Sequence, residues 1–242
     1  MEQEMFCYQC QETAGGKGCT KMGVCGKKAD TALEQDKLIL ATKKLGLAVL
    51  EKGAKAEDVK SAAPLAINNL FKTITNANFD NSALEKAIDE TQALTSKING
   101  GKTLAENAEL GVLATQDEDI RSLRELITYG LKGLAAYLKH ALVLGYSDDK
   151  INLFVLTALA KLLDKNLTLD DYVALTMETG TYGVQGMALL DKANTETYGN
   201  PEITSVNIGV RKNPGILVSG HDLKDLEMLL DQTKGTGVDV YT

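Results

Sequence analysis

The sequence predicts a mainly α-helical protein that begins with a cysteine-rich loop and ends in a βαβ unit of a parallel sheet. Alanine and leucine dominate the composition, aromatic residues make up 5% and tryptophan is absent, which favours helix packing over a β-sandwich. Leucines recur at helical spacing through most of the chain, and the character changes to short β-type runs near residue 200. We therefore expect three segments: a loop over residues 1–29, a helical domain over 30–200 and the start of an α/β domain over 201–242.

The first predicted helix follows the cysteine loop. Asp30 is its expected N-terminal cap, and Gly53 can end it in the left-handed conformation. One stripe along it is expected to be buried, because leucines fall seven residues apart. The stripe consists of Leu33, Leu40 and Leu47.

A second helix is expected over about residues 57–75, with Pro64 either kinking it or marking its start. Asp80 then caps a third helix, which Gly100 and Gly101 stop. Three helices with short connections predict an antiparallel bundle.

A second bundle is expected after residue 116. Its long first helix begins at Asp117 and ends at Gly145, and residues 148–164 are apolar nearly all round, which is typical of a central helix. Thr168 and Asp171 form a start resembling a capping box for the next helix. The run GVQGMALLDKAN predicts one further helix.

The last segment has the pattern strand, helix, strand. EITSVNIGV and GILVSG are β-type runs, HDLKDLEMLLDQTKG is an amphipathic helix with Asp222 as its cap, and GVDVYT is a third strand. Such a unit cannot bury both of its faces alone. We therefore expect a truncated α/β domain that ends at Thr242.

Charge and hydropathy exclude several classes of protein. A net charge of −7 argues against nucleic acid as the main partner, because phosphate binding needs a basic face. No apolar run approaches the roughly 20 residues that cross a bilayer, and the acidic start MEQEMFCYQC lacks the apolar segment of a signal peptide. We expect a cytoplasmic protein with no membrane partner.

All four cysteines lie in the N-terminal loop, with the spacing Cys-x2-Cys-x8-Cys-x5-Cys. Disulfides are uncommon in the cytoplasm. Four thiolates can bind zinc, although zinc ribbons usually repeat a Cys-x2-Cys hook in both halves of the site. An iron–sulfur cluster fits better, because each iron of a cubane needs one terminal thiolate and a glycine-rich loop can wrap it. The spacing differs from the ferredoxin run, so zinc remains an alternative.

Three other residues are candidates for a place near a cluster. Lys17 and Lys21 belong to a set of four lysines in the loop that would stabilise a reduced, anionic cluster; alternatively, they form a solvated surface. His221 follows the GILVSG run, where open α/β sheets place functional groups; alternatively, it helps to form the loop before a helix. His140, on a long helix, is expected to pack.

The segment FCYQCQETAGGKGCTKMGVCGKK closely resembles the N-terminal part of the hybrid cluster protein family, also called prismane proteins. The likeness continues through LFKTITNANFD, ITYGLKGLAAYLKHALVLG, TYGNPEITSVNIGVRKNPGILVSGHDLKDLEMLL and GTGVDVYT. The resemblance covers essentially this whole chain and less than half of a family member. The cysteine spacing looks like that of members from anaerobes.

The resemblance implies that Cys7, Cys10, Cys19 and Cys25 ligate a [4Fe-4S] cubane. It implies a helical domain of two three-helix bundles, followed by Rossmann-like domains. In the family, a catalytic hybrid [4Fe-2O-2S]-type cluster lies where the domains meet, and its His, Glu and Cys ligands begin after the stretch that matches GVDVYT. None of those ligands is in this sequence, so no catalytic residue is assigned.

The resemblance also implies a function. The cubane of an intact member would relay electrons to the hybrid cluster, which reduces hydroxylamine or nitric oxide-type substrates, as in an oxidoreductase of the hydroxylamine reductase type. The expected partners are an electron donor protein or small redox carrier and the remaining Rossmann-like domains, and these 242 residues alone are expected to be inactive. The alternatives are a helical interaction module stabilised by a four-cysteine zinc site and a stand-alone electron-transfer protein.

Overall fold

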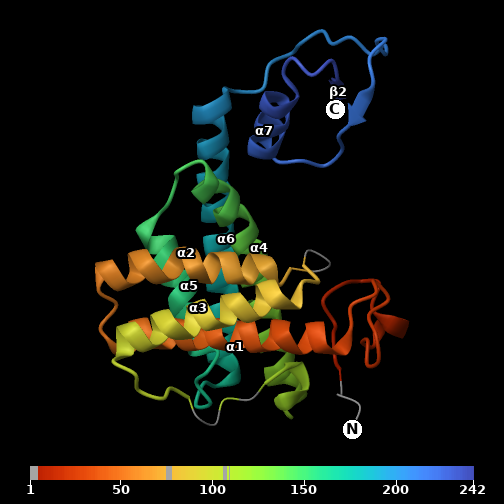
Figure 1. The fold of residues 1–242 in the computed structure, drawn as a ribbon. Helices are drawn as coiled ribbons and strands as arrows, with labels where there is room; N and C mark the ends of the chain where they lie inside the picture. The colour runs from red at the N-terminus through yellow and green to blue at the C-terminus, as the bar shows by residue number, and fades with distance from the viewer. Residues whose placement is uncertain (1–4, 75–77, 106–107, 109) are drawn as a thin grey trace.

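The structure is a computed structural model that describes residues 5–74, 78–105, 108 and 110–242. It is mainly helical, as the sequence predicts (Figure 1). The elements in chain order are η1 (Ala14–Gly16), α1 (Ala29–Glu51), α2 (Ala56–Lys72), α3 (Asn81–Asn99), η2 (Val112–Ala114), α4 (Glu118–Val143), α5 (Asp149–Lys161), α6 (Leu169–Tyr198), β1 (Gly215–Leu217), α7 (Leu223–Thr233) and β2 (Asp239–Tyr241).

The helices pack around one another, with α5 lying mainly against α1 and α2. Helix α1 packs against α2, α3 and α5, while α4 packs against α2 and α6. Figure 1 shows α1, α2 and α3 side by side, with α6 running across them. One apolar cluster contains residues from α1, α2, α4, α5 and α6, so these helices share a core. The cysteine loop lies at the N-terminal end of α1, so the position of α1 determines where the loop sits.

The helix-capping predictions are confirmed at most positions. Asp80, Asp117 and Asp222 each accept a hydrogen bond from the first turn of the helix that follows, and Thr168 with Asp171 forms a complete capping box. Gly53 has a φ of +83°, as the prediction of a left-handed helix end requires.

The prediction that Asp30 caps α1 is wrong. The cap position is Lys28, which makes no side-chain capping bond, and Asp30 already lies inside the first turn. There its Oδ1 accepts a hydrogen bond from Thr31 N at 2.7 Å. The carboxylate thus still faces the positive end of the helix dipole, from one position further along.

The buried stripe of α1 is also shifted from the predicted one. Leu33, Leu40 and Leu47 are only partly buried, whereas Leu38 and Leu45 are fully buried. Three other helices pack around α1, so its buried face is wider than one leucine stripe.

The predicted start of α2 near residue 57 is confirmed, but one alternative for Pro64 and one predicted break after Thr168 are wrong. Helix α2 begins at Ala56, so Pro64 lies in its interior and does not mark its start. The two helices expected after Thr168 are one helix, α6, which continues through Gly183 and Gly186. A Cβ at Gly186 would collide with Leu134 of α4, so this glycine serves close helix packing instead of ending a helix.

The C-terminal segment contains only part of the expected βαβ unit. Strands β1 and β2 pair in parallel, with Ile216 opposite Val240, and α7 connects them. The run EITSVNIGV forms no strand, and its Ile203 and Ile208 are fully exposed. A strand needs a partner for its backbone hydrogen bonds, and nothing in the described residues pairs with this run. A Rossmann-like sheet stays a prediction, as does the division of the chain into domains.

The C-terminal unit contacts the helical part through side chains. Tyr198 at the end of α6 donates to Glu227 of α7 at 2.7 Å, and His140 Nδ1 lies 3.3 Å from Asp222 Oδ2. Among the described helices, none is long and apolar enough to cross a membrane.

Helix α1 approaches α5 unusually closely at Gly46. A Cβ built on Gly46 would lie 2.5 Å from the backbone oxygen of Leu156, a distance that real Cβ atoms do not show. Backbone atoms cannot move aside as a flexible side chain can. The absence of a side chain at Gly46 is therefore a condition for packing α1 against α5.

Replacing Gly46 with alanine should destabilise the protein by about 1–3 kcal/mol, because the added methyl group overpacks the α1–α5 contact. Gly133→Ala is the matched control: Gly133 is exposed on α4 with nothing near its Cβ position, so the change should stabilise by about 0.5–1 kcal/mol. Urea unfolding followed by circular dichroism measures both. A Gly46→Ala protein as stable as Gly133→Ala would contradict this view of the contact.

Candidate metal centre

A short backbone pairing organises the cysteine loop. Cys7 N donates to Cys19 O at 3.0 Å and Cys19 N donates to Cys7 O at 2.9 Å, which forms an isolated antiparallel bridge. Thr13 Oγ1 donates to Cys7 O at 3.0 Å and holds the intervening turn against the bridge. Two backbone hydrogen bonds therefore place the first and third cysteines side by side.

Two glycines allow the chain to turn inside the loop. Gly18 has a φ of +125°, and a Cβ there would lie 2.5 Å from the ring of Phe6. A Cβ on Gly23 would lie 2.9 Å from Cys25 Sγ. The second turn is closed by hydrogen bonds from Gly23 N to Lys27 O and from Gly26 N to Gly23 O, both of 2.8 Å. Larger side chains at these positions would displace Phe6 or Cys25.

Hydrogen-bond donors point at the sulfur of Cys19. Ala14 N lies 3.4 Å from Cys19 Sγ, and Thr13 Oγ1 lies 3.6 Å from it. The backbone amides of Ala14 and Val24, followed by the Thr13 hydroxyl, lower the pKa of Cys19 below its ordinary value. This environment favours the thiolate, which is the form that binds metals.

A lysine also reaches the cysteines, but it is neither of the two that the sequence singled out. Lys17 and Lys21 have exposed side chains. Lys27 is buried, and its Nζ lies 3.7 Å from Cys7 Sγ and 2.7 Å from Gln35 Oε1. The sequence does contain a pattern that could have indicated the burial of Lys27. Polar residues recur four apart at Lys27, Thr31 and Gln35, a spacing that places them on one side where α1 begins.

Helix α4 anchors the other side of the loop. Tyr129 donates from its hydroxyl to Tyr8 O at 3.2 Å. Lys132 Nζ donates to Gln9 Oε1 at 3.0 Å and to Thr73 O at 3.1 Å. The residues between Cys7 and Cys10 are thus fixed by a helix more than a hundred residues away in sequence.

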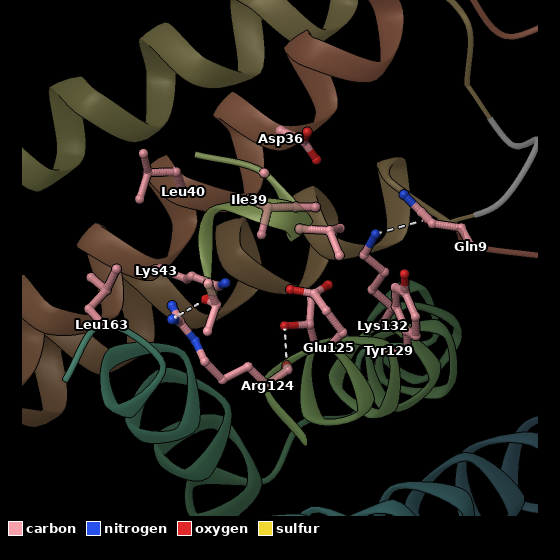
Figure 2. A pocket seen from close by; sticks show the side chains of 14 residues that line it. Gln9, Asp36, Ile39, Leu40, Lys43, Arg124, Glu125, Tyr129, Lys132 and Leu163 are labelled. Carbon is pink, nitrogen blue, oxygen red and sulfur yellow. Dashed lines mark hydrogen bonds between the residues drawn. The ribbon is translucent and has the colours of Figure 1, made fainter. Parts of the chain in front are cut away.

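A cavity of about 40 Å³ lies next to this anchor, between α1 and α4 (Figure 2). Gln9 lines it, and it is unusually rich in charge for an interior site. Its charged lining residues are Asp36, Lys43, Arg124, Glu125 and Lys132. Within the described part of the chain, no two of these five charged groups approach to ion-pair distance. Space of this size and polarity can hold ordered water.

Burial shifts the ionisation of the groups in this cavity. It raises the pKa of Asp36 to about 6, against the opposing effect of Lys132, and it lowers the pKa of Lys132 to about 8. Burial also lowers the pKa of Lys43. This cluster is not predictable from the sequence, because Asp36 and Lys43 have the spacing of ordinary surface charges on an amphipathic helix.

The four thiols match a metal centre in number and chemistry. All are free cysteines on one loop, and amide, hydroxyl and ammonium donors lie against two of them. Cys25 is exposed, and among the described residues no three His, Cys, Asp or Glu side chains converge closely enough to hold a metal ion. Four free thiols with these donors have the chemistry of an iron–sulfur or zinc site, and the four side chains would have to come closer together to bind it.

Both histidines lie at the C-terminal unit and not in the loop. His221 is exposed, and its ring nitrogens lie 2.8 Å from Thr242 Oγ1 and 3.2 Å from Asp222 O. His140 packs edge-on against Phe71, as expected, but its contact with Asp222 was not anticipated. It could have been found only by knowing that α7 docks beside α4.

Asp36→Asn should stabilise the protein at neutral pH. Because the folded-state pKa of Asp36 lies above its ordinary 3.8, the folded state binds this proton more tightly, and the stability contribution of Asp36 falls as pH rises from about 4 to 6. Removing the buried charge should raise the free energy of unfolding by about 1–3 kcal/mol at pH 7.5 and change it little near pH 4. Urea titrations across this range measure the difference.

Asp231→Asn, at an exposed position on α7, is the control and should leave the pH profile unchanged. If the free energy of unfolding depended on pH in the same way in Asp36→Asn and Asp231→Asn, burial would not destabilise the charged form of Asp36.

Comparison with known proteins identifies the family. The model of the Prismane/CO dehydrogenase family matches residues 5–242. Proteins named hydroxylamine reductase from Caldanaerobacter subterraneus, Clostridium perfringens and Desulfovibrio desulfuricans are 55%, 54% and 54% identical to the chain. The alignments cover at least 98% of this chain and 48% of each relative, so the chain spans about half the length of the curated relatives it matches. Because the family model covers nearly the whole sequence, the protein belongs to the Prismane/CO dehydrogenase family.

Proposed function

We propose that this chain is the part of a hydroxylamine reductase-type oxidoreductase that accepts and passes on electrons through a [4Fe-4S] cluster held by Cys7, Cys10, Cys19 and Cys25. The observation that carries the proposal is the loop itself. All four cysteines are free and share one loop whose donors point at sulfur, in a chain about half identical to proteins named hydroxylamine reductase.

The cluster would supply one-electron chemistry, and the loop residues would control its charge. Ala14 N donates to Cys19 Sγ and Thr13 Oγ1 lies 3.6 Å from the same sulfur, and such polar contacts stabilise the more negative, reduced state. Lys132 and Tyr129 of α4 hold the loop backbone in place, and so limit its movement when the charge of the site changes. The roles of Lys17, Lys21 and His221 stay predictions, because none of the three contacts a cysteine within the part of the chain that the structure describes.

The partners belong to the same proposal. An electron donor protein or small redox carrier would approach the loop where Cys25 is exposed. Electrons would pass to a hybrid [4Fe-2O-2S]-type cluster in the rest of the full-length protein, because these 242 residues contain no cysteine after Cys25. The Rossmann-like domains of that protein would also extend the sheet formed by β1 and β2.

Metal analysis tests the cluster. The chain purified without oxygen should be brown and contain about four iron and four sulfide per molecule, with an electron paramagnetic resonance signal after reduction. Cys19→Ser should lose most of the iron, since its thiolate has the most donors. Thr20→Ser, an exposed neighbour in the same loop, should retain it. A colourless protein that contains zinc without iron or sulfide would exclude this function and favour the structural zinc site.

A second measurement tests whether these 242 residues accept electrons without reducing hydroxylamine. We expect the 242 residues to accept electrons from dithionite but to give no hydroxylamine turnover, because they lack cysteine ligands for a second cluster. Turnover by the iron-loaded chain alone would show that the reaction occurs at the cysteine loop, contrary to the proposal.

A further inference from the structure

Lys27 is the most deeply buried charged side chain near the cysteine loop. It is 2% exposed and lies just before α1, at the junction between the loop and the helical domain. Lys28, the next residue, is exposed. Two adjacent lysines therefore have the same charge and opposite environments.

The surroundings of Lys27 provide no carboxylate at contact distance. Its Nζ contacts Gln35 Oε1 at 2.7 Å and Cys7 Sγ at 3.7 Å, and no ion pair within 4 Å is found for it among the described residues. Asp36 is close enough for its pKa to be influenced by the charge of Lys27, but it does not pair with it. Burying an ammonium group is costly unless an anion compensates it. The group in contact that can carry negative charge is the Cys7 sulfur.

Gln35 fixes the direction of the ammonium group. It is itself buried on α1, and its Nε2 donates to Asn78 O at 3.1 Å. This bond orients the amide so that Oε1 faces Lys27. The side chain of Lys27 is thus held between a neutral acceptor and a cysteine, and cannot turn to solvent without removing the hydrogen-bond donor of Gln35 Oε1.

We propose that Lys27, positioned by Gln35, places a permanent positive charge beside the Cys7 side of the metal centre and thereby makes that centre easier to reduce. The inference rests on the proposed iron–sulfur function and deepens it by naming the residue that sets the reduction potential. Addition of one electron from a reductant such as dithionite raises the negative charge of the centre by one. The nearby ammonium group stabilises that added charge, and no bond is made or broken.

The test is a redox titration of the iron-loaded chain, followed by electron paramagnetic resonance. Lys27→Met keeps the length of the side chain and removes its charge. At a fixed potential, its ratio of reduced to oxidised centre should fall at least tenfold, a shift of about 59 mV towards more negative potentials for a one-electron couple. Lys28→Met removes the same charge from the exposed neighbour and should shift the ratio by less than twofold, because solvent and salt screen it.

Two further variants separate charge from packing. Lys27→Arg keeps the charge and should stay closer to the wild-type potential than Lys27→Met. Gln35→Leu keeps Lys27 but removes its acceptor, and should shift the ratio in the same direction by a smaller factor. If Lys27→Met does not retain iron, the reduction potential of Gln35→Leu becomes the test of the inference. A Gln35→Leu protein that titrates at the wild-type potential would show that the inference is wrong.

Iron content distinguishes failure of this inference from failure of the proposed function. One contrary outcome is that Lys27→Met holds the same iron and sulfide as the wild type and titrates at the same potential. In that case Lys27 does not influence the reduction potential, while the proposed iron–sulfur function is still supported. If the wild-type chain itself binds no iron and sulfide, the proposed function fails, and the inference about Lys27 fails with it.

Discussion

The close contact between α1 and α5 at Gly46 is the constraint on which the rest of the structure depends. Helix α1 packs against three other helices, and its polar residues are arranged in order along its length. Gln35 faces the cysteine loop, Asp36 and Lys43 face the charged cavity, and Gly46 meets α5. A shift of α1 at Gly46 would therefore move both the cavity wall and the support of the loop.

The loop itself is held by contacts of three kinds. Backbone pairing joins Cys7 to Cys19, glycines permit the turns, and side chains from α1 and α4 fix the outside. Of these, only the glycines are apparent from the loop sequence. The buried ammonium and amide contacts explain how a loop with few apolar residues can keep a defined shape beside the helices.

The sequence predicted the features that depend on local chemistry. The caps at Asp80, Asp117 and Thr168 and the left-handed end at Gly53 were predictable, because each involves residues within one helical turn. The grouping of the four cysteines on one loop and the mainly helical fold could also be predicted, because both follow from spacings along the sequence. The rest depends on contacts between distant segments. The continuity of α6 requires Leu134 opposite Gly186, and the burial of Lys27 requires Gln35. The absent strand at EITSVNIGV has the same cause, because a β-type sequence needs a partner to become a strand.

The anchoring of the loop by α4 has a consequence for biosynthesis. Tyr129 and Lys132 follow the loop residues that they contact by 121 and 123 positions. At a synthesis rate of about 5–20 residues per second, roughly ten seconds pass between the emergence of the cysteines and that of their anchors. During this interval the loop has left the ribosome without its α4 support. The loop is thus among the last segments to receive its full set of contacts, although it precedes the helix that supplies them in the chain.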